Sequence, residues 1–368
     1  MKNDRVFRWL FCVCLFPVLV FSQDNPLRWI AFPDPVFTVN GLPAWEENSP
    51  DLFRLPKSAE SKVRKAVWYL SQSPSGGRIR FRSDCTDLLI QLEYPHRGNM
   101  SNMHRFGQSG VDLYIDNTYV STATPRDSTV VEFSFFNKRP AGMRNITLYL
   151  PLYSSVKIRA IAVNTEAKFE APLPFVLEKP VVYYGSSITQ GGCASHPGMS
   201  YQAIVSRNLQ IDFVNHGYSG NGMGEAEMAE EIARIDASCY VLDFGVNLPD
   251  AESLAKVYGP FLDILRKIKP STPVIAVTPI YMAQEFWEPN EATRMRDIIR
   301  REVARLRNKG DQNILLVEGF ELLGPDMADG FVDGVHPNDL GFQAMAEGLQ
   351  PYLARILNVS GRNFKLTH

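Results

Sequence analysis

The chain has 368 residues, with 38 lysines and arginines against 40 aspartates and glutamates, so its formal net charge is −2. Hydrophobic residues make up 45% and charged residues 21%, which is ordinary globular composition and excludes a disordered or fibrous protein. The near-neutral balance argues against a nucleic-acid-binding protein, because that function needs a clustered positive charge. The length is large for one hydrophobic core and favours two domains.

Residues 1–22 have the pattern of a secretory signal peptide. Three basic residues precede a short apolar run, Trp9–Phe21, and the small residue Ser22 follows it. The run is shorter than the roughly 20 apolar residues that a membrane-spanning helix needs. We therefore expect cleavage near Ser22 and export to the periplasm, the cell surface or the medium, with no transmembrane anchor in the mature chain.

The cysteine content does not indicate a disulfide framework, because the chain has only five cysteines. Two of them lie in the predicted signal peptide, which leaves Cys85, Cys193 and Cys239 in the mature chain. Export leads to an oxidising compartment, so Cys193 and Cys239 are candidates for a disulfide. The sequence leaves this pairing open, since it does not give the distance between the two residues.

The first half of the mature chain has apolar residues at alternate positions, which is typical of β-strands. The predicted strands are rich in β-branched and aromatic residues and are separated by turn residues; they are 66–70, 78–82, 87–94, 111–116, 129–136, 146–152 and 155–163. No helical pattern intervenes between them. We therefore predict a β-sandwich of jelly-roll type over residues 23–172, followed by a proline-rich linker, 173–180.

The pattern changes from residue 181 onward, where strands and helices alternate. Nearly all-apolar strands are predicted at 181–185, 211–217, 239–245, 272–279 and 313–319, and helices at 200–208, 225–235, 251–268, 290–308 and 340–357. This alternation predicts an α/β domain over residues 181–368, with a parallel sheet covered on both faces. Sites in such sheets form at the carboxyl ends of the strands, so the loops after the strands should carry the chemistry.

Three of these loops carry residues suited to acyl transfer. Ser187 follows the first strand in a tight Gly-Ser-Ser turn, Gly220 lies in a glycine-containing loop after the second, and Asn247 follows the third. Glycine allows close approach of the backbone to a ligand, and a side-chain amide can donate to an oxyanion. The second loop does not match a phosphate-binding G-x-G-x-x-G motif, because Glu225 stands where its last glycine would be.

The last loop carries Asp333 and His336, three residues apart. One loop can thus deliver a carboxylate to Nδ1–H of the imidazole while Nε2 stays available as a base. Each of these residues alone also fits an ordinary turn or helix cap. Their occurrence together, in this order and each after a predicted strand or before the last helix, favours a nucleophilic hydrolase.

At these residues the sequence resembles the SGNH hydrolases, also called GDSL-type esterases. The resemblance covers about 180–357 and rests on the block Gly185–Ile188, on Gly220, on Asn247 and on the D-x-x-H pair. Ser186 stands where the family usually has aspartate. Upstream, the segment Gly110–Tyr114 resembles the GxDLY motif of a domain that precedes SGNH domains in some exported bacterial proteins, and the pairing resembles two-domain carbohydrate esterases.

The resemblance implies a flavodoxin-like three-layer domain and a serine esterase mechanism. Ser187 would be the nucleophile, His336 the base and Asp333 its orienting carboxylate, with an oxyanion hole made by Ser187, Gly220 and Asn247. No metal or organic cofactor is implied, and the histidines show no tight metal-ligand spacing. The expected substrate is a small-molecule or carbohydrate ester, above all an O-acetyl group on carbohydrate.

Aromatic residues near the predicted site offer candidate sugar contacts. Tyr218, Phe244 and Trp287 could form such a platform, although ordinary packing is an equal alternative. His196 and His216 lie in or near the predicted site loops and could contact substrate, but an ordinary loop role is favoured for each. Two other functions stay open: a lipase or thioesterase of the same family, and a carbohydrate-binding protein with a decayed site, which only Ser186 favours. The sequence decides neither glycan binding by the β-domain nor the oligomeric state.

Overall fold

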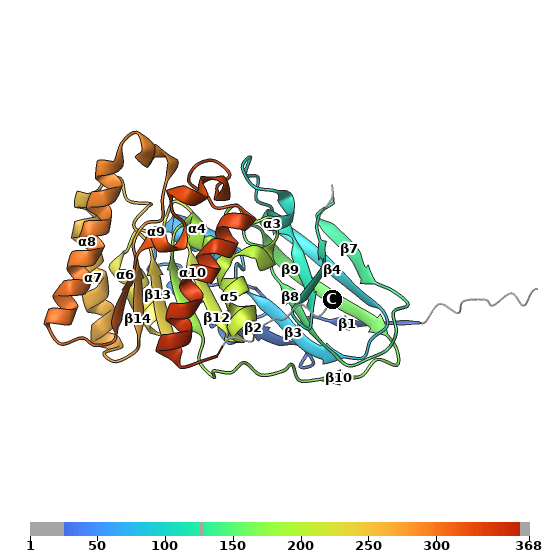
Figure 1. Ribbon diagram of the computed structural model, residues 1–368. Helices are drawn as coiled ribbons and strands as arrows, with labels where there is room; N and C mark the ends of the chain where they lie inside the picture. Colours follow the sequence, from blue (N-terminus) through green and yellow to red (C-terminus); the bar gives the residue numbers. More distant parts are fainter. Residues whose placement is uncertain (1–25, 126–127, 361–368) are drawn as a thin grey trace, which may run out of the picture.

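The computed structural model describes residues 26–125 and 128–360. The predicted signal peptide and its cleavage site lie outside the described residues. A β-sheet domain and an α/β domain lie side by side, and an extended segment that follows the β-sheet domain leads into the first strand of the α/β domain (Figure 1). None of the helices in the described ranges combines the length and the apolar character needed to cross a membrane.

The C-terminal domain is built on one sheet of five strands in the order β12-β11-β13-β14-β15. The strands are β11 (Val181–Gly185), β12 (Phe213–Gly217), β13 (Cys239–Asp243), β14 (Val274–Val277) and β15 (Ile314–Val317), and every neighbouring pair is parallel. This is the flavodoxin-like order, in which the first strand, β11, lies second from one edge and the order of the strands reverses beside it. The predicted parallel sheet is therefore confirmed.

Helices cover both faces of this sheet. Helices α5 (Tyr201–Leu209) and α10 (Asp339–Leu357) lie on one face, and α6 (Ala226–Ala233), α7 (Ala251–Ile268) and α8 (Pro289–Asn308) lie on the other (Figure 1). The side chains of β11 alternate between the two cores, since Val181 and Tyr183 pack with the first helices and Val182 and Tyr184 with the second. Burial on both faces explains why these strands are almost entirely apolar.

The N-terminal domain consists of two antiparallel sheets, with strand orders β1-β9-β4-β7 and β10-β3-β8-β5-β6, and β2 paired to β3. The strands are β1 (Leu27–Ala31), β2 (Thr38–Asn40), β3 (Arg78–Ser83), β4 (Leu88–His96), β5 (Val111–Ile115), β6 (Thr118–Ala123), β7 (Val130–Phe136), β8 (Arg144–Tyr149), β9 (Ser155–Asn164) and β10 (Phe169–Glu170). Inward residues of both sheets form one hydrophobic core. The jelly-roll connection between them stays a prediction.

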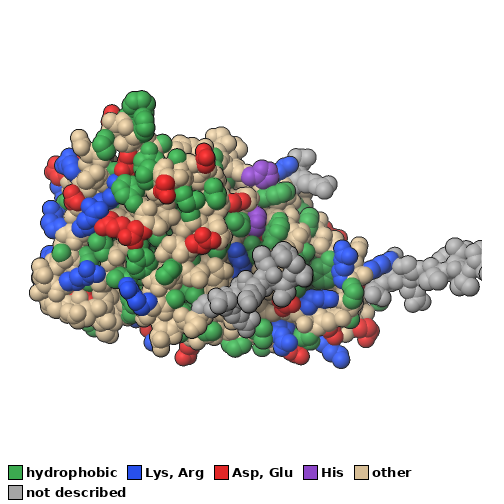
Figure 2. Space-filling model, viewed as in Figure 1, with side chains coloured by type: hydrophobic (Ala, Val, Ile, Leu, Met, Phe, Trp, Pro, Cys, Tyr) green, Lys and Arg blue, Asp and Glu red, His purple; other side chains and the backbone are tan. Residues whose placement is uncertain are grey.

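Short helices complete the fold. They are α1 (Trp45–Asn48), η1 (Lys57–Ala59), α2 (Lys65–Ser71), α3 (Arg105–Ser109), α4 (Ser187–Gln190), η2 (Pro197–Met199), η3 (Ala283–Phe286), α9 (Gly319–Leu322) and η4 (Pro325–Gly330). On the face shown in Figure 2, acidic and basic side chains are interspersed over the helices of the C-terminal domain. That face thus lacks the broad field of one sign that would attract a polyanion.

The prediction of a strand at 66–70 is wrong, because this segment forms α2. Val67 is fully buried and packs with Leu55 and Val63 in the same core as Val182 of the C-terminal sheet. These contacts with the other domain override the local β propensity of the segment. The predictions also missed β1, β2, β6 and β10, which are either very short or largely exposed and so lack a clear hydrophobic alternation.

The N-terminal segment is fastened to the C-terminal domain by a buried arginine. Arg54 is fully buried, and its Nη1 donates to the carbonyl oxygens of Asn215 (3.1 Å) and Gly217 (2.5 Å), at the end of β12. Its guanidinium also lies 4.6 Å from the centre of the Tyr218 ring. The two domains therefore share structure rather than meeting only at a linker.

The GxDLY segment supplies a second junction. Asp112 has no exposed surface; its Oδ1 accepts a hydrogen bond from Thr122 Oγ1 (2.7 Å) of its own domain. Its Oδ2 accepts hydrogen bonds from Gly198 N (2.7 Å) and His196 Nδ1 (2.6 Å) of the C-terminal domain. The preceding glycine is required by space, because a Cβ at Gly110 would lie 2.2 Å from the Phe106 carbonyl oxygen. The motif thus places a carboxylate at the domain interface.

The candidate disulfide is not formed. Cys193 and Cys239 are both buried free thiols, as is Cys85. Burial raises the pKa of the Cys239 thiol to about 12. This side chain is therefore held as an uncharged, apolar core residue.

Replacing Asp112 with alanine should lower the free energy of unfolding by about 3–5 kcal/mol, because two buried donors and the partly buried His196 lose their acceptor. Denaturant unfolding of the full chain measures this difference. The control Glu132→Ala removes an exposed carboxylate of the same domain and should change the stability by less than about 0.5 kcal/mol. Equal stabilities of the two variants would contradict the proposed role of the interface.

Candidate active site

The loop after β11 presents Ser187 at a tight turn. Ser186 caps α4, accepting a hydrogen bond from Ile188 N at 3.2 Å, and Ser187 is the first helical residue, 7% exposed. A Cβ at Gly185 would lie 2.0 Å from Thr189 Oγ1 and 2.2 Å from the Asp243 carbonyl oxygen, so only glycine fits there. Ser186, which stands in place of the acid typical of the family it resembles, thus fulfils a capping role.

The structure brings Ser187, His336 and Asp333 together. Ser187 Oγ lies 2.9 Å from His336 Nε2, and His336 Nδ1 lies 2.9 Å from Asp333 Oδ2. With the Nδ1 proton donated to the carboxylate, Nε2 is the nitrogen that accepts from the serine hydroxyl. This is the nucleophile, base and orienting carboxylate geometry of a serine hydrolase.

The carboxylate of Asp333 is held by several donors. Its Oδ1 accepts from the backbone N–H groups of His336 (2.9 Å) and Val335 (3.1 Å), and its Oδ2 also accepts from Asn102 Nδ2 (2.8 Å). Partial burial alone would raise the pKa of Asp333, but the hydrogen bonds from His336 and Asn102 outweigh it and hold this pKa well below its usual range. Asp333 therefore stays ionised in neutral and mildly acidic solution.

The loops that carry Gly220 and Asn247 are joined to the serine loop through Tyr218. The Tyr218 N–H donates to the Gly185 carbonyl oxygen (2.9 Å), and Asn247 Nδ2 donates to the Tyr218 carbonyl oxygen (3.2 Å). This bond uses one of the two amide hydrogens of Asn247 and leaves the other for a ligand. Gly220 has a φ of +63°, a left-handed conformation that favours glycine.

Asn102 is a site residue that the sequence analysis missed. It belongs to the N-terminal domain and lies 231 positions before Asp333 in the chain, so no local spacing connects the two. Gln108 holds the loop that carries it: its Oε1 accepts from Met100 N (2.8 Å), and its Nε2 donates to the carbonyl oxygens of Met100 (2.9 Å) and Met103 (2.6 Å). The one sequence signal near Asn102 is the GxDLY segment, which resembles a domain that precedes SGNH domains.

A second missed residue, Asp243, lies at the end of β13 below the serine turn. It accepts hydrogen bonds from Tyr201 Oη (3.0 Å) and Thr189 Oγ1 (3.3 Å). Burial raises the pKa of Asp243 to about 7, although these two hydrogen bonds act in the opposite direction. The carboxyl group ties α4 and α5 to the sheet directly behind Ser187.

The candidate sugar contacts do not come together. Tyr218 and Phe244 are 0% and 2% exposed, and their rings pack in the core against α6 and α7. Trp287 is 80% exposed and meets Phe286, 72% exposed, edge to face with 4.8 Å between ring centres. Of the three predicted aromatic contacts, only Trp287 is therefore open to a ligand.

His196 lies in a loop as predicted, but the prediction of a loop residue is wrong for His216, which is a buried residue of β12. His196 binds Asp112 at the domain interface, and buried His216 lies with its Nδ1 2.9 Å from Tyr218 Oη. Within residues 26–125 and 128–360, no group of three His, Cys, Asp or Glu side chains is arranged to hold a metal ion.

Replacing Asn102 with alanine should lower kcat about tenfold and leave KM nearly unchanged, because a hydrogen bond to a charged group that positions the base is lost. Steady-state ester hydrolysis measures both constants. Asn99→Ala, an exposed asparagine of the same loop, is the matched control and should behave as the wild type. A kcat of Asn102→Ala equal to that of the control would refute a positioning role.

Buried His216 should make the fold sensitive to acid. Burial, reinforced by the charge of Arg54, lowers the pKa of His216 from 6.5 to about 3. As the pH falls, His216 is therefore protonated in the unfolded chain before it is protonated in the folded protein. The free energy of unfolding that is present above pH 6.5 is thus lost as the pH falls toward 3. Between pH 7 and pH 5 the wild type should lose about 2 kcal/mol more than His216→Asn.

Denaturant unfolding at the two pH values measures this loss. The matched control is His96→Asn, which changes an exposed histidine and should keep the pH dependence of the wild type. The explanation fails if His216→Asn is as sensitive to acid as the control.

Comparisons with known protein families agree with this geometry. Residues 178–354 match the profile of the GDSL-like lipase/acylhydrolase family. Residues 27–169 match the GxDLY profile, which describes the N-terminus of SGNH-hydrolase-type esterases. Together the two profiles account for nearly all of the described residues.

Solved structures are similar to this chain over most of its length. A protein from Bacteroides ovatus described as a GDSL-like lipase is 29% identical, with a TM-score of 0.83 over 91% of this chain and 99% of that one. The salicylyl-acyltransferase SsfX3 of a tetracycline biosynthetic pathway is 21% identical (TM-score 0.76; 90% and 97% covered). A family two carbohydrate esterase from Clostridium thermocellum, in complex with cellohexaose, is 17% identical (TM-score 0.61; 77% and 93% covered). The last two likenesses show the fold alone.

Proposed function

Because the chain belongs to the GDSL-like lipase/acylhydrolase family, with a GxDLY domain before its hydrolase domain, we propose that it is a serine esterase that hydrolyses small acyl esters. The observation that carries the proposal is the hydrogen-bonded series Ser187–His336–Asp333, with 2.9 Å at each step. The same observation argues against a decayed, non-catalytic site.

In the proposed first step, Ser187 Oγ attacks the ester carbonyl carbon while His336 Nε2 takes its proton. The Asp333 carboxylate stabilises the imidazolium that forms, and its lowered pKa keeps it ionised for this task. The imidazolium then gives the proton to the departing alcohol. An acyl-enzyme remains, and a water molecule, deprotonated by His336, hydrolyses it to release the carboxylic acid.

The tetrahedral intermediate places a negative charge on the former carbonyl oxygen. We propose that the N–H groups of Ser187 and Gly220 and the remaining amide hydrogen of Asn247 bind this oxygen. The Ser187 N–H is available because the first N–H groups of a helix have no partner within it. Preorganised donors of this kind contribute roughly 10²–10³ in rate each.

The proposed substrate is an O-acetyl ester of a carbohydrate. It is supported by the structural likeness to a carbohydrate esterase bound to cellohexaose and by the exposed rings of Phe286 and Trp287, which can stack on sugar faces. The predicted export is consistent with a polysaccharide substrate. A lipase-type substrate is less favoured, because no apolar lid is evident in the sequence.

Replacing Ser187 with alanine should reduce the hydrolysis of p-nitrophenyl acetate by about 10³-fold or more, because no nucleophile then remains. The control Ser195→Ala changes a nearby partly buried serine that has no part in the proposed chemistry and should keep full activity. Full turnover by Ser187→Ala would disprove the assignment.

The substrate class needs a separate comparison of esters. Acetylated cello- and xylo-oligosaccharides should be better substrates than long-chain p-nitrophenyl esters, as judged by kcat/KM. A preference for the long chains would replace the proposal by a lipase. Transfer of the acyl group to an added alcohol in preference to water would instead indicate an acyltransferase, the activity named for one structural neighbour.

A further inference from the structure

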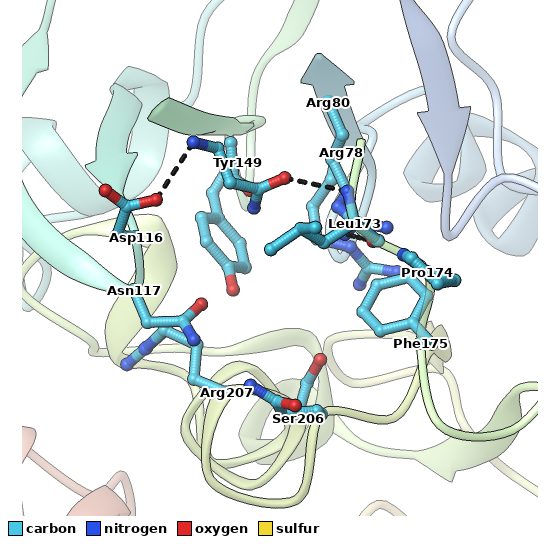
Figure 3. Close-up of a pocket in the computed structure, with 13 residues that line it drawn as sticks. Arg78, Arg80, Asp116, Asn117, Tyr149, Leu173, Pro174, Phe175, Ser206 and Arg207 are labelled. Atoms are coloured by element: carbon cyan, nitrogen blue, oxygen red, sulfur yellow. Dashed lines mark hydrogen bonds between the residues drawn. The ribbon is translucent and has the colours of Figure 1, made fainter. Parts of the chain in front are cut away.

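A cavity lies between the two domains, away from Ser187. It has a volume of about 350 Å³ and is enclosed by β3, β8, the turn between β5 and β6, the segment Leu173–Phe175 and the end of α5 (Figure 3). Arg78 in its wall binds Asp212, which directly precedes β12, whereas the catalytic loops follow the ends of β11, β12 and β13. The cavity is therefore at the opposite end of the parallel sheet from the active site.

Three guanidinium groups converge on this cavity. Arg78 and Arg80 lie on the outer face of β3, opposite Tyr149 and Thr147 of β8, while the alternate residues of β3 fill the β-domain core. Arg207 comes from α5 of the other domain, with its guanidinium 5.6 Å from the centre of the Tyr149 ring. Neither domain alone assembles this set of charges.

Three arginines and one acid line the cavity, and Asp112, which lies outside the lining, also acts on the charge of Arg207. Arg78 and Arg80 are 1% and 7% exposed. Asp212 pairs with Arg78, and Asp116 is the only acid among the described residues that line the cavity; its Oδ1 already accepts from Asn145 N (2.9 Å). Burial lowers the pKa of Arg80 to about 10, and the charge of Arg78 adds to this effect. An added anion would relieve this repulsion.

Two buried guanidinium nitrogens also lack a hydrogen-bond acceptor. They are Arg78 Nε and Arg207 Nη1, both without solvent contact. The other nitrogens of Arg78 are satisfied, since Nη1 donates to the Gly76 carbonyl oxygen (2.9 Å) and Nη2 to Asp212 and the Phe213 carbonyl oxygen (3.1 Å). Buried donors are rarely left unpaired in folded proteins, so these two guanidinium groups retain unused capacity to bind an acceptor.

The remaining wall suits a polyol better than a bare ion. The amides of Asn117 and Gln210 and the hydroxyl group of Tyr149 belong to the lining, and the ring of Phe175 lies 4.0 Å from the Arg80 guanidinium. In Figure 3, Asn117, Tyr149 and Phe175 surround one common space. A volume of about 350 Å³ exceeds that of an inorganic anion and is in the range of small-ligand pockets.

We propose that this interdomain cavity binds an acidic sugar, with its carboxylate toward Arg78, Arg80 and Arg207 and its hydroxyl groups toward the amides. The site is separate from Ser187 and does not depend on the proposed esterase function. Because residues of both domains form the site, an acidic glycan bound there would contact both domains. It would therefore hold the whole protein, rather than the β-domain alone, on the polysaccharide that carries the acidic sugar.

Isothermal titration calorimetry of the full chain with D-glucuronate tests the proposal, with D-glucose and inorganic phosphate as the comparison probes. D-glucuronate should bind at least about tenfold more tightly than D-glucose, because the carboxylate meets buried guanidinium groups. It should also bind more tightly than inorganic phosphate, because the phosphate ion lacks the sugar hydroxyl groups. Equal binding of D-glucuronate and D-glucose, or tighter binding of phosphate, would overturn the acidic-sugar assignment.

A pair of charge variants localises the binding. Gln210 lies at the end of α5 in a left-handed conformation, and Gln210→Glu and Gln210→Lys share that backbone cost while differing in charge. Gln210→Glu should weaken D-glucuronate binding at least about tenfold, and Gln210→Lys should not weaken it. Unchanged binding in Gln210→Glu would show that the ligand lies elsewhere. Ester hydrolysis should stay at the wild-type rate in both variants, because Gln210 has no part in the Ser187 site.

Discussion

The carboxylate of Asp112 is the contact on which the arrangement of the two domains depends. It is fully buried and joins Thr122 of the β-domain to His196 and Gly198 of the α/β domain. A buried carboxylate with three donors is costly to separate from any of them, so the interface has one preferred geometry. Arg54 adds a second buried link between the domains, at the end of β12.

This fixed interface lets the β-domain take part in building the active site. Two positions before the GxDLY glycine, Gln108 holds the loop that delivers Asn102 to Asp333. Tyr153, also of the β-domain, donates from its hydroxyl group to the Ser187 carbonyl oxygen (3.2 Å). The proposed catalytic residues thus all come from the α/β domain, while part of their positioning comes from its neighbour.

The sequence predicted the parts of the structure that follow from local pattern. Helix α7 agrees with its predicted range, and the loops with Ser187, Asn247 and Asp333 lie where parallel-sheet geometry expects them. It did not predict what depends on long-range packing. Val67 lies in a helix because it packs against the other domain. The rings of Tyr218 and Phe244 are buried in the core instead of facing a ligand. Asn102 binds Asp333 although 231 positions separate them in the chain.

The central claim, that His336 and Asp333 activate Ser187 as a nucleophile, is tested most directly by covalent trapping. Diisopropyl fluorophosphate should phosphorylate Ser187 Oγ with loss of fluoride, and peptide mass spectrometry should find one adduct per chain at this residue. Replacement of His336 with alanine should prevent the reaction, because the base is lost. A folded wild-type protein that stays unmodified, or that carries the adduct on another serine, would contradict the account.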